Sequence, residues 1–150
     1  MEDGSTMTWA GDSALVADRD LELRFDVRGP DGQPAILEPY MGMASHAVIA
    51  RDDGAVFIHL HPLGTIAMAS QLVFVLRQPG DTVRGPLGRR ITAYRDPMDS
   101  RVGPATGSFS IPYAFPRPGH YRMWVQVKRG GRILTGVFEM DVGGSGGSGR

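Results

Sequence analysis

The strongest constraint on the fold is a pair of adjacent glycines, Gly130 and Gly131, between two runs of alternating apolar and polar residues. Such a pair favours a two-residue turn between antiparallel strands, because both central positions of that turn require positive φ. The turn pairs Arg129 with Arg132, and the register then continues along both strands. One face carries the apolar pairs Val127–Leu134, Met123–Phe138 and Tyr121–Met140, and the other carries Arg122–Glu139, His120–Asp141 and Trp124–Val137. Matched apolar and oppositely charged pairs support this register.

The first part of the chain also has the pattern of strands. Leu21, Leu23, Phe25 and Val27 alternate with polar residues, which predicts a half-buried strand, and the turn sequence 29–32 ends it. No stretch shows a helical period. For 150 residues, this indicates one all-β domain over residues 1–142, an antiparallel immunoglobulin-like β-sandwich. Residues 143–150 have the composition of a flexible Gly/Ser linker added for expression.

The stretch from 64 to 107 is harder to interpret. Residues 72–76 are predicted to form a buried strand, which residues 64–70 either begin or precede as one helical turn. Residues 77–107 contain many glycines, prolines and arginines and predict a long loop, in which only Arg90 to Tyr94 has strand character.

A second hairpin is predicted around Asp52-Asp53-Gly54, which separates the apolar runs 47–50 and 56–58. Its loop length decides which residue lies opposite His46. A two-residue turn at Asp53-Gly54 places His46 opposite His61, and a four-residue loop from Arg51 to Gly54 places it opposite His59. A three-residue loop turns His46 to the other face of the sheet.

Three of the four histidines, His46, His59 and His61, belong to this hairpin. Side chains two residues apart in a strand lie on the same face, about 7 Å apart, so His59 and His61 point the same way. With a loop of even length, the ring of His46 points that way as well. Directly opposed residues lie roughly 4.5–5.5 Å apart. We therefore expect a three-histidine cluster that can offer three nitrogen ligands to Cu²⁺ or Zn²⁺.

Methionines near the histidines favour copper over zinc. Met41 and Met43 precede His46, Met68 follows His61, and thioethers are soft ligands that suit Cu(I). We expect Met41 or Met43 as a fourth donor. The alternative is a structural role, in which the methionines fill the core and the imidazoles bond to the backbone or to one another.

Other aromatic and charged residues have simpler interpretations. Trp9, Trp124 and Tyr121 are expected to pack inside the sandwich. His120 is expected to form a surface ion pair with Asp141, worth less than about 1 kcal/mol.

Several classes of function are disfavoured. The net charge of zero argues against a nucleic-acid partner, and the absence of cysteine excludes thiolate ligands, disulfides and cysteine nucleophiles. No apolar run reaches the ~18 residues of a membrane span. A zinc hydrolase is a weaker alternative, because Glu38, Asp52 and Asp53 are the only carboxylates near the histidines in sequence.

The segment from Met41 to His46 resembles the Met-x-Met-x-x-His segment of YtkA/FixH-like extracytoplasmic domains. The segments 118–124 and 136–140 are similar to the closing hairpin of that family, and the turn at 31–34 also fits. The resemblance implies an immunoglobulin-like fold in the periplasm or outside the cell, often associated with membrane proteins and with copper or oxidase-assembly systems. The long 77–107 stretch departs from the compact family pattern.

Together these patterns predict an extracytoplasmic metal carrier or sensor domain rather than an enzyme, with copper bound by His46, His59 and His61 and zinc as the other candidate metal. The alternative is an immunoglobulin-like interaction domain without a cofactor, part of a larger membrane-associated protein. In that case the arginine-rich loop or an exposed sheet edge contacts the partner.

Overall fold

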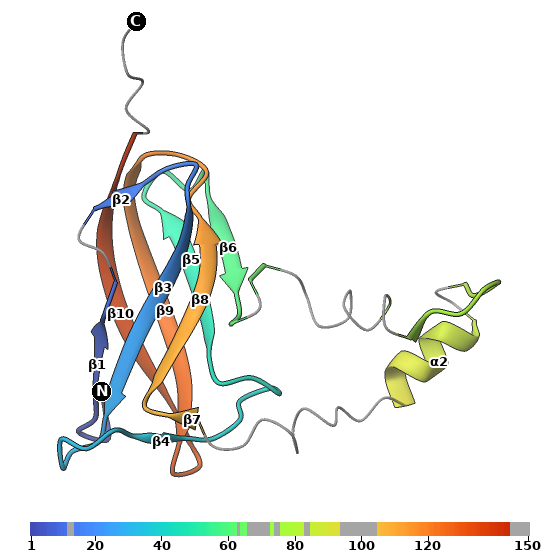
Figure 1. Ribbon diagram of the computed structural model, residues 1–150, viewed down its shortest axis with the longest axis horizontal. Coiled ribbons are helices and arrows are strands. Elements are labelled where there is room, and N and C mark those ends of the chain that lie inside the picture. Colours follow the sequence, from blue (N-terminus) through green and yellow to red (C-terminus); the bar gives the residue numbers. More distant parts are fainter. Residues whose placement is uncertain are drawn as a thin grey trace, which may run out of the picture.

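The protein is an immunoglobulin-like β-sandwich (Figure 1). The structure, a computed structural model, describes residues 1–11, 14–62, 64–65, 73, 76–82, 85–93 and 105–144. Its larger sheet has five strands in the order β2 (Leu15–Val16), β10 (Arg132–Gly143), β9 (Gly119–Arg129), β5 (His46–Arg51) and β6 (Phe57–Leu60). Its second sheet has three strands in the order β1 (Thr6–Trp9), β3 (Asp20–Arg28) and β8 (Ser108–Ala114). The predicted fold class is therefore confirmed.

The hairpin of β9 and β10 has the register that the sequence predicts. Arg129 pairs with Arg132, and the ladder continues to the pair of Gly119 with Val142. Both turn glycines have positive φ, 56° at Gly130 and 72° at Gly131. The turn chemistry thus fixes which face of each strand is apolar.

The core lies between the two sheets. On the side of the larger sheet it is built from the inward-facing residues of β5, β6, β9 and β10, and on the other side from β3 and β8. Its fully buried side chains include Leu23, Phe25, Ile49, Leu60, Ile111, Tyr121, Met123 and Val125. Leu23, Phe25 and Val27 of the predicted alternating strand are all buried, which confirms that interpretation.

The packing of the predicted core aromatics is confirmed in two cases of three. Tyr121 is fully buried, and Trp9 packs edge-on against Phe25 with 5.5 Å between ring centroids. Trp124 lies instead on the outer face of the larger sheet, because it alternates with the buried Met123 and Val125 along β9. The expectation that Trp124 packs inside the sandwich is wrong.

Two short pairings complete the β structure. β2 runs parallel to β10, with Leu15 opposite Val142, so the larger sheet is not wholly antiparallel. β4 (Ile36–Leu37) pairs with β7 (Ala105–Thr106) at one end of the sandwich. Gly143, which the sequence assigns to a linker, is the last residue of β10 and pairs with Val16. The rest of that linker, from residue 145, lies outside the described residues.

The stretch between β6 and β7 contains a helix, α2 (Pro86–Ala93), which Figure 1 shows apart from the two sheets. The expected strand character of Arg90 to Tyr94 is wrong, at least as far as Ala93, the last described residue there. Pro86 begins the helix, where its fixed φ is favourable, and Leu87 and Ile91 are spaced one helical turn apart. Val73 and Leu76 are also helical, against the strand predicted over 72–76. The remaining residues of that segment, most of 64–70 and Met68 lie outside the described residues.

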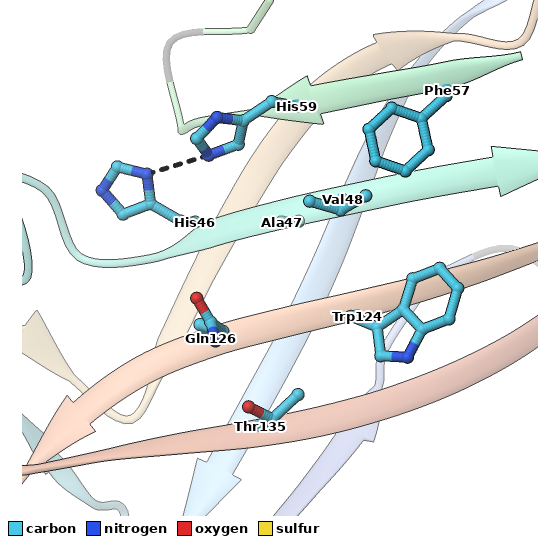
Figure 2. A pocket seen from close by; sticks show the side chains of 8 residues that line it. All are labelled: His46, Ala47, Val48, Phe57, His59, Trp124, Gln126 and Thr135. Carbon is cyan, nitrogen blue, oxygen red and sulfur yellow. Dashed lines mark hydrogen bonds between the residues drawn. The ribbon is translucent and has the colours of Figure 1, made fainter.

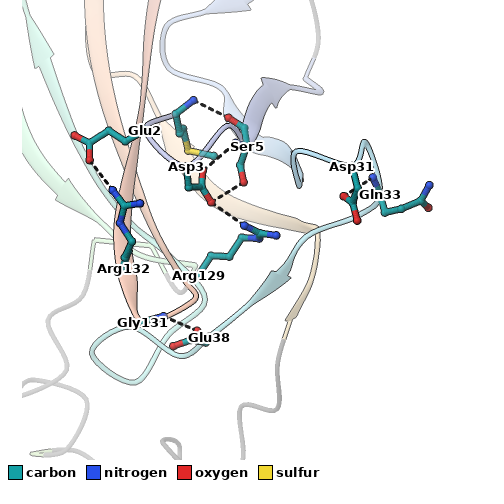
Figure 3. A network of polar contacts seen from close by, with 10 residues as sticks. Glu2, Asp3, Ser5, Asp31, Gln33, Glu38, Arg129, Gly131 and Arg132 are labelled. Atoms are coloured by element: carbon teal, nitrogen blue, oxygen red, sulfur yellow. Dashed lines mark hydrogen bonds and ion pairs between the residues drawn. The ribbon is translucent and has the colours of Figure 1, made fainter.

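Glu2 and Asp3 at the N-terminus form ion pairs with Arg132 and Arg129, which flank the β9–β10 turn (Figure 3). Asp3 accepts hydrogen bonds from the Ser5 backbone and hydroxyl and pairs with Arg129 at 2.8 Å. Glu38 accepts a hydrogen bond from the Gly131 backbone at 2.9 Å. These contacts hold the end of the sandwich that carries the turn. Among the helices that the structure describes, none is long and apolar enough to span a membrane.

A candidate metal centre of three histidines

The hairpin of β5 and β6 has an even loop, as the cluster requires. The Arg51 backbone donates to Val56 O at 2.9 Å, and Gly54 donates to Arg51 O at 2.8 Å, so the loop contains four residues, 52–55. This loop starts one residue later than the predicted four-residue loop. Ala47 lies opposite Leu60, which is the register of the predicted two-residue turn. Continued by one residue, the register places His46 opposite His61.

The three histidines converge, as predicted from the parity of the loop. Their ring centroids are 5.4 Å apart for His46 and His59, 5.0 Å for His46 and His61, and 4.6 Å for His59 and His61. One nitrogen from each ring lies within 4.8 Å of the others. The three histidines lie on the outer face of the larger sheet. Ala47, which follows His46, and Leu60, which separates His59 from His61, point into the core.

The loop before β5 determines the protonation of His46. Nε2 of His46 lies 3.0 Å from the carbonyl oxygen of Tyr40, which can only accept a hydrogen bond. Nε2 therefore carries the proton in the neutral ring, and Nδ1 keeps its lone pair. This Nδ1 is 3.2 Å from Nε2 of His59. Metal-binding histidines commonly have such a backbone contact on the second nitrogen.

His61 is also fixed in place. Its backbone N–H donates to Gly64 O at 2.9 Å, and its carbonyl accepts from Gly64 at 2.8 Å. Its Nδ1 is buried and has no hydrogen-bond partner among the described residues. A buried ring nitrogen without a partner is costly unless a ligand occupies it.

Burial keeps two of the rings neutral. His46 is 4% exposed and His61 7% exposed, whereas His59 is exposed. Burial lowers the pKa of His46 below its ordinary value, and the neighbouring His61 and His59 rings lower it further. Burial and the His59 ring likewise lower the pKa of His61. Their lone pairs are therefore available at neutral pH.

The predicted methionine donors lie in a tight turn beside the cluster. Tyr40 and Met43 exchange two backbone hydrogen bonds, of 2.8 and 3.1 Å, around Met41 and Gly42. Met41 and Gly42 both have positive φ, 49° and 78°. Met43 is buried, and Met41 is 67% exposed. The turn contacts the cluster through Tyr40, whose ring centroid is 5.1 Å from that of His46. Ligation by either methionine stays a prediction.

Two of the three carboxylates named from the sequence, Glu38 and Asp53, have other partners. Glu38 pairs with Lys128 at 3.4 Å, and Asp53 pairs with Arg51 in the hairpin loop. The clustered metal-binding side chains among the described residues are all histidines. His120 contacts Asp141 at 2.8 Å on the surface, as predicted.

A groove with a volume of about 430 Å³ adjoins the cluster on the same face (Figure 2). Val48 lies opposite both His59 and Trp124, so a row of side chains crosses three strands. The groove is lined by His46, Ala47, Val48, Phe57, His59, Trp124, Gln126 and Thr135. The groove could not be predicted from the sequence, because β5 and β9 are far apart in the chain and their pairing has no local signal. The outward position of Trp124 was implicit in the predicted register, where it shares a face with Arg122.

Comparisons with known proteins give a family match and a similarity to solved structures. A family described as Domain of unknown function (DUF8832) matches residues 1–84, which include all three histidines of the cluster but not β8, β9 or β10. Among curated proteins, none matches the chain. A solved structure described as "Crystal structure of the Lin-41 filamin domain" is similar, with 14% identity and a TM-score of 0.45 over 95% of this chain and 94% of that chain.

Proposed function

This chain belongs to the family described as Domain of unknown function (DUF8832), and we propose that it binds a copper ion through His46, His59 and His61. The observation that carries the proposal is the convergence of three ring nitrogens within 4.8 Å, with the proton of His46 held away from them by Tyr40. The buried Nδ1 of His61, which has no partner among the described residues, supports it. Three imidazoles form a suitable ligand set for copper.

Copper is favoured over zinc for two reasons. Imidazole sites generally bind Cu²⁺ more tightly than Zn²⁺, and a nearby thioether from Met41 or Met43 would add affinity for Cu(I). Zinc is the second candidate metal, because three histidines with an open position also suit Zn²⁺.

We propose a role as a carrier or sensor domain rather than as an enzyme. Two of the ligands are buried and the third, His59, is exposed on the edge strand β6, so an incoming ion would reach His59 first. The proposed location, periplasmic or extracellular and tethered to a membrane in a longer protein, rests on the resemblance to YtkA/FixH-like domains alone.

A metal titration tests the proposal. Protein purified without a nickel column or a histidine tag is titrated with Cu²⁺, with Cu(I) under reducing conditions and with Zn²⁺ at neutral pH. We expect one copper ion per chain, with tighter binding than zinc. Absence of copper binding at neutral pH would refute the proposal.

His59 and His120 provide a matched pair of variants. Both side chains are exposed on the larger sheet, but only His59 belongs to the cluster. His59→Gln should weaken copper binding by at least about tenfold, or about 1.4 kcal/mol. His120→Gln should leave binding unchanged. Equal effects of the two variants would indicate unspecific surface binding.

The second candidate function is a cofactor-free interaction domain. It is favoured by Phe57, which is 73% exposed on the edge strand β6, and by the exposed Val137 on the same face of the sheet. Exposed apolar side chains at a sheet edge are a common feature of interaction surfaces. Protein that is free of metal and whose thermal stability does not change on adding copper would favour this function.

A further inference from the structure

The groove beside the histidines has two chemically different ends. Figure 2 shows the rings of His46 and His59 at one end and the side chains of Phe57, Val48 and Trp124 at the other. Along β5, Val48 is two residues beyond His46, which corresponds to about 7 Å in a strand. The groove volume of about 430 Å³ is within the range of small-molecule sites.

The charges around the groove favour an anion once a metal is bound. Among the described residues that line the groove, none is an acid, a lysine or an arginine. Arg122 lies 6.0 Å from the Trp124 ring, and its guanidinium is already paired with Glu139. Because neutral imidazoles do not compensate a cation, the bound metal would be the uncompensated charge at this end of the groove.

We propose that the groove binds a small carboxylate with an aromatic or aliphatic body, whose carboxylate oxygen completes the coordination of the metal. This inference rests on the proposed metal site. A metal with three protein ligands keeps an open position, and an ion held by His46 and His59 borders the groove because both residues line it. The body of the ligand lies over Val48 and Trp124, and Gln126 and Thr135 offer hydrogen bonds along the groove. Binding displaces water from the metal and requires no redox step.

The test uses 3-phenylpropionate as the probe and its uncharged amide as the comparison. Each is titrated by calorimetry into the whole chain, with and without one equivalent of Cu²⁺, and retention of the metal is checked after the titration. We expect the carboxylate to bind the loaded protein at least about tenfold more tightly than the amide, and more tightly than it binds the metal-free protein. Equal binding to loaded and metal-free protein would overturn the inference, because the carboxylate would then not be coordinated.

Trp124→Ala tests the apolar end, and Ile133→Ala is its control. Ile133 is an exposed apolar residue on the same face of the sheet, but it does not line the groove. Trp124→Ala should weaken probe binding by about tenfold and leave copper affinity unchanged. Ile133→Ala should change neither.

The outcomes separate the two proposals. If copper does not bind, the proposed function fails and this inference fails with it. If copper binds with the expected stoichiometry and the loaded protein does not bind the carboxylate, only this inference is overturned. Loss of copper to the probe in solution would also overturn it, because the groove would then not hold both together.

Discussion

The Nδ1 atom of His46 lies 3.2 Å from the Nε2 atom of His59, and the two residues belong to neighbouring strands of one sheet. His46 is buried and held by the Tyr40 carbonyl, whereas His59 is exposed at the sheet edge. Without a metal, the Nδ1 lone pair of His46 accepts a hydrogen bond from Nε2–H of His59. A metal bound by both nitrogens would displace that proton, so protons and metal compete for the same atoms.

Copper binding should weaken in acid. The pKa values of His46 and His61 are both lowered, so these rings remain neutral at the ordinary histidine pKa of about 6.5 and protonate only at lower pH. We expect affinity to be nearly constant between pH 7 and 8 and to fall steeply as pH drops below the ordinary histidine pKa of about 6.5. Titrations in a series of weakly coordinating buffers measure this. Affinity that does not change down to pH 4 would exclude histidine ligation.

The metal-free protein should be less stable in acid. His46 and His61 have lower pKa values in the folded state than in the unfolded state, so the unfolded chain binds more protons between the two values. Their contribution to stability is complete above about pH 6.5 and is lost as pH falls through the folded-state pKa. Urea unfolding with a chelator, followed from pH 7.5 to 5, measures the loss.

Two variants isolate the histidine contribution to this pH dependence. His61→Gln should flatten the change in stability with pH, whatever its effect on stability at neutral pH. The contribution of His120 to stability changes with pH in the opposite direction. Its hydrogen bond to Asp141 raises its pKa, so that contribution is lost as pH rises. His120→Gln should therefore not flatten the loss of stability in acid. A pH dependence that is the same in both variants would contradict the assignment.

Two buried tyrosines should respond differently to loss of the hydroxyl. The Tyr121 hydroxyl donates to Arg117 O at 2.7 Å, so Tyr121→Phe should reduce the free energy of unfolding by about 1 kcal/mol. The Tyr113 hydroxyl has no partner among the described residues, and burial raises the pKa of Tyr113 to about 12. Tyr113→Phe should be neutral or stabilising by up to about 1 kcal/mol. Chemical denaturation of both variants is the measurement, and equal losses would contradict this prediction.

Met41 should be replaceable with a gain in stability. Its φ of 49° is unfavourable for a side chain without local hydrogen-bonding capacity, and 67% of the residue is exposed. Met41→Asn should raise the free energy of unfolding by up to about 1 kcal/mol, since asparagine tolerates this conformation. A decrease in the free energy of unfolding would indicate that the Met41 side chain makes stabilising contacts although it is largely exposed. Cu(I) titration of this variant, compared with Met43→Leu, identifies which thioether donates to the metal.

The sequence predicted the elements whose structure depends on neighbouring residues. The glycine pair at 130–131 fixes the β9–β10 register because few backbone conformations can close so short a turn. The same reasoning placed His46, His59 and His61 on one face for a hairpin loop of even length, but it left the loop length open between two, three and four residues. It failed at α2, where the helix spans only eight residues, too few for its periodicity to stand out among glycines and prolines.

The sequence by itself determined two hairpins and the sandwich class, and it made the clustering of three imidazoles depend on the length of one loop, which the structure shows to be even. Only the tertiary structure decided that β5 pairs with β9, that Tyr40 fixes the proton of His46, and that Trp124 faces outward to form a groove beside the histidines. The physical reason is the range of the interactions. Turn geometry and side-chain alternation act within a few residues, whereas pairing between strands 70 to 80 residues apart, from Arg51 with Tyr121 to His46 with Gln126, depends on burying the apolar faces of the whole chain at once.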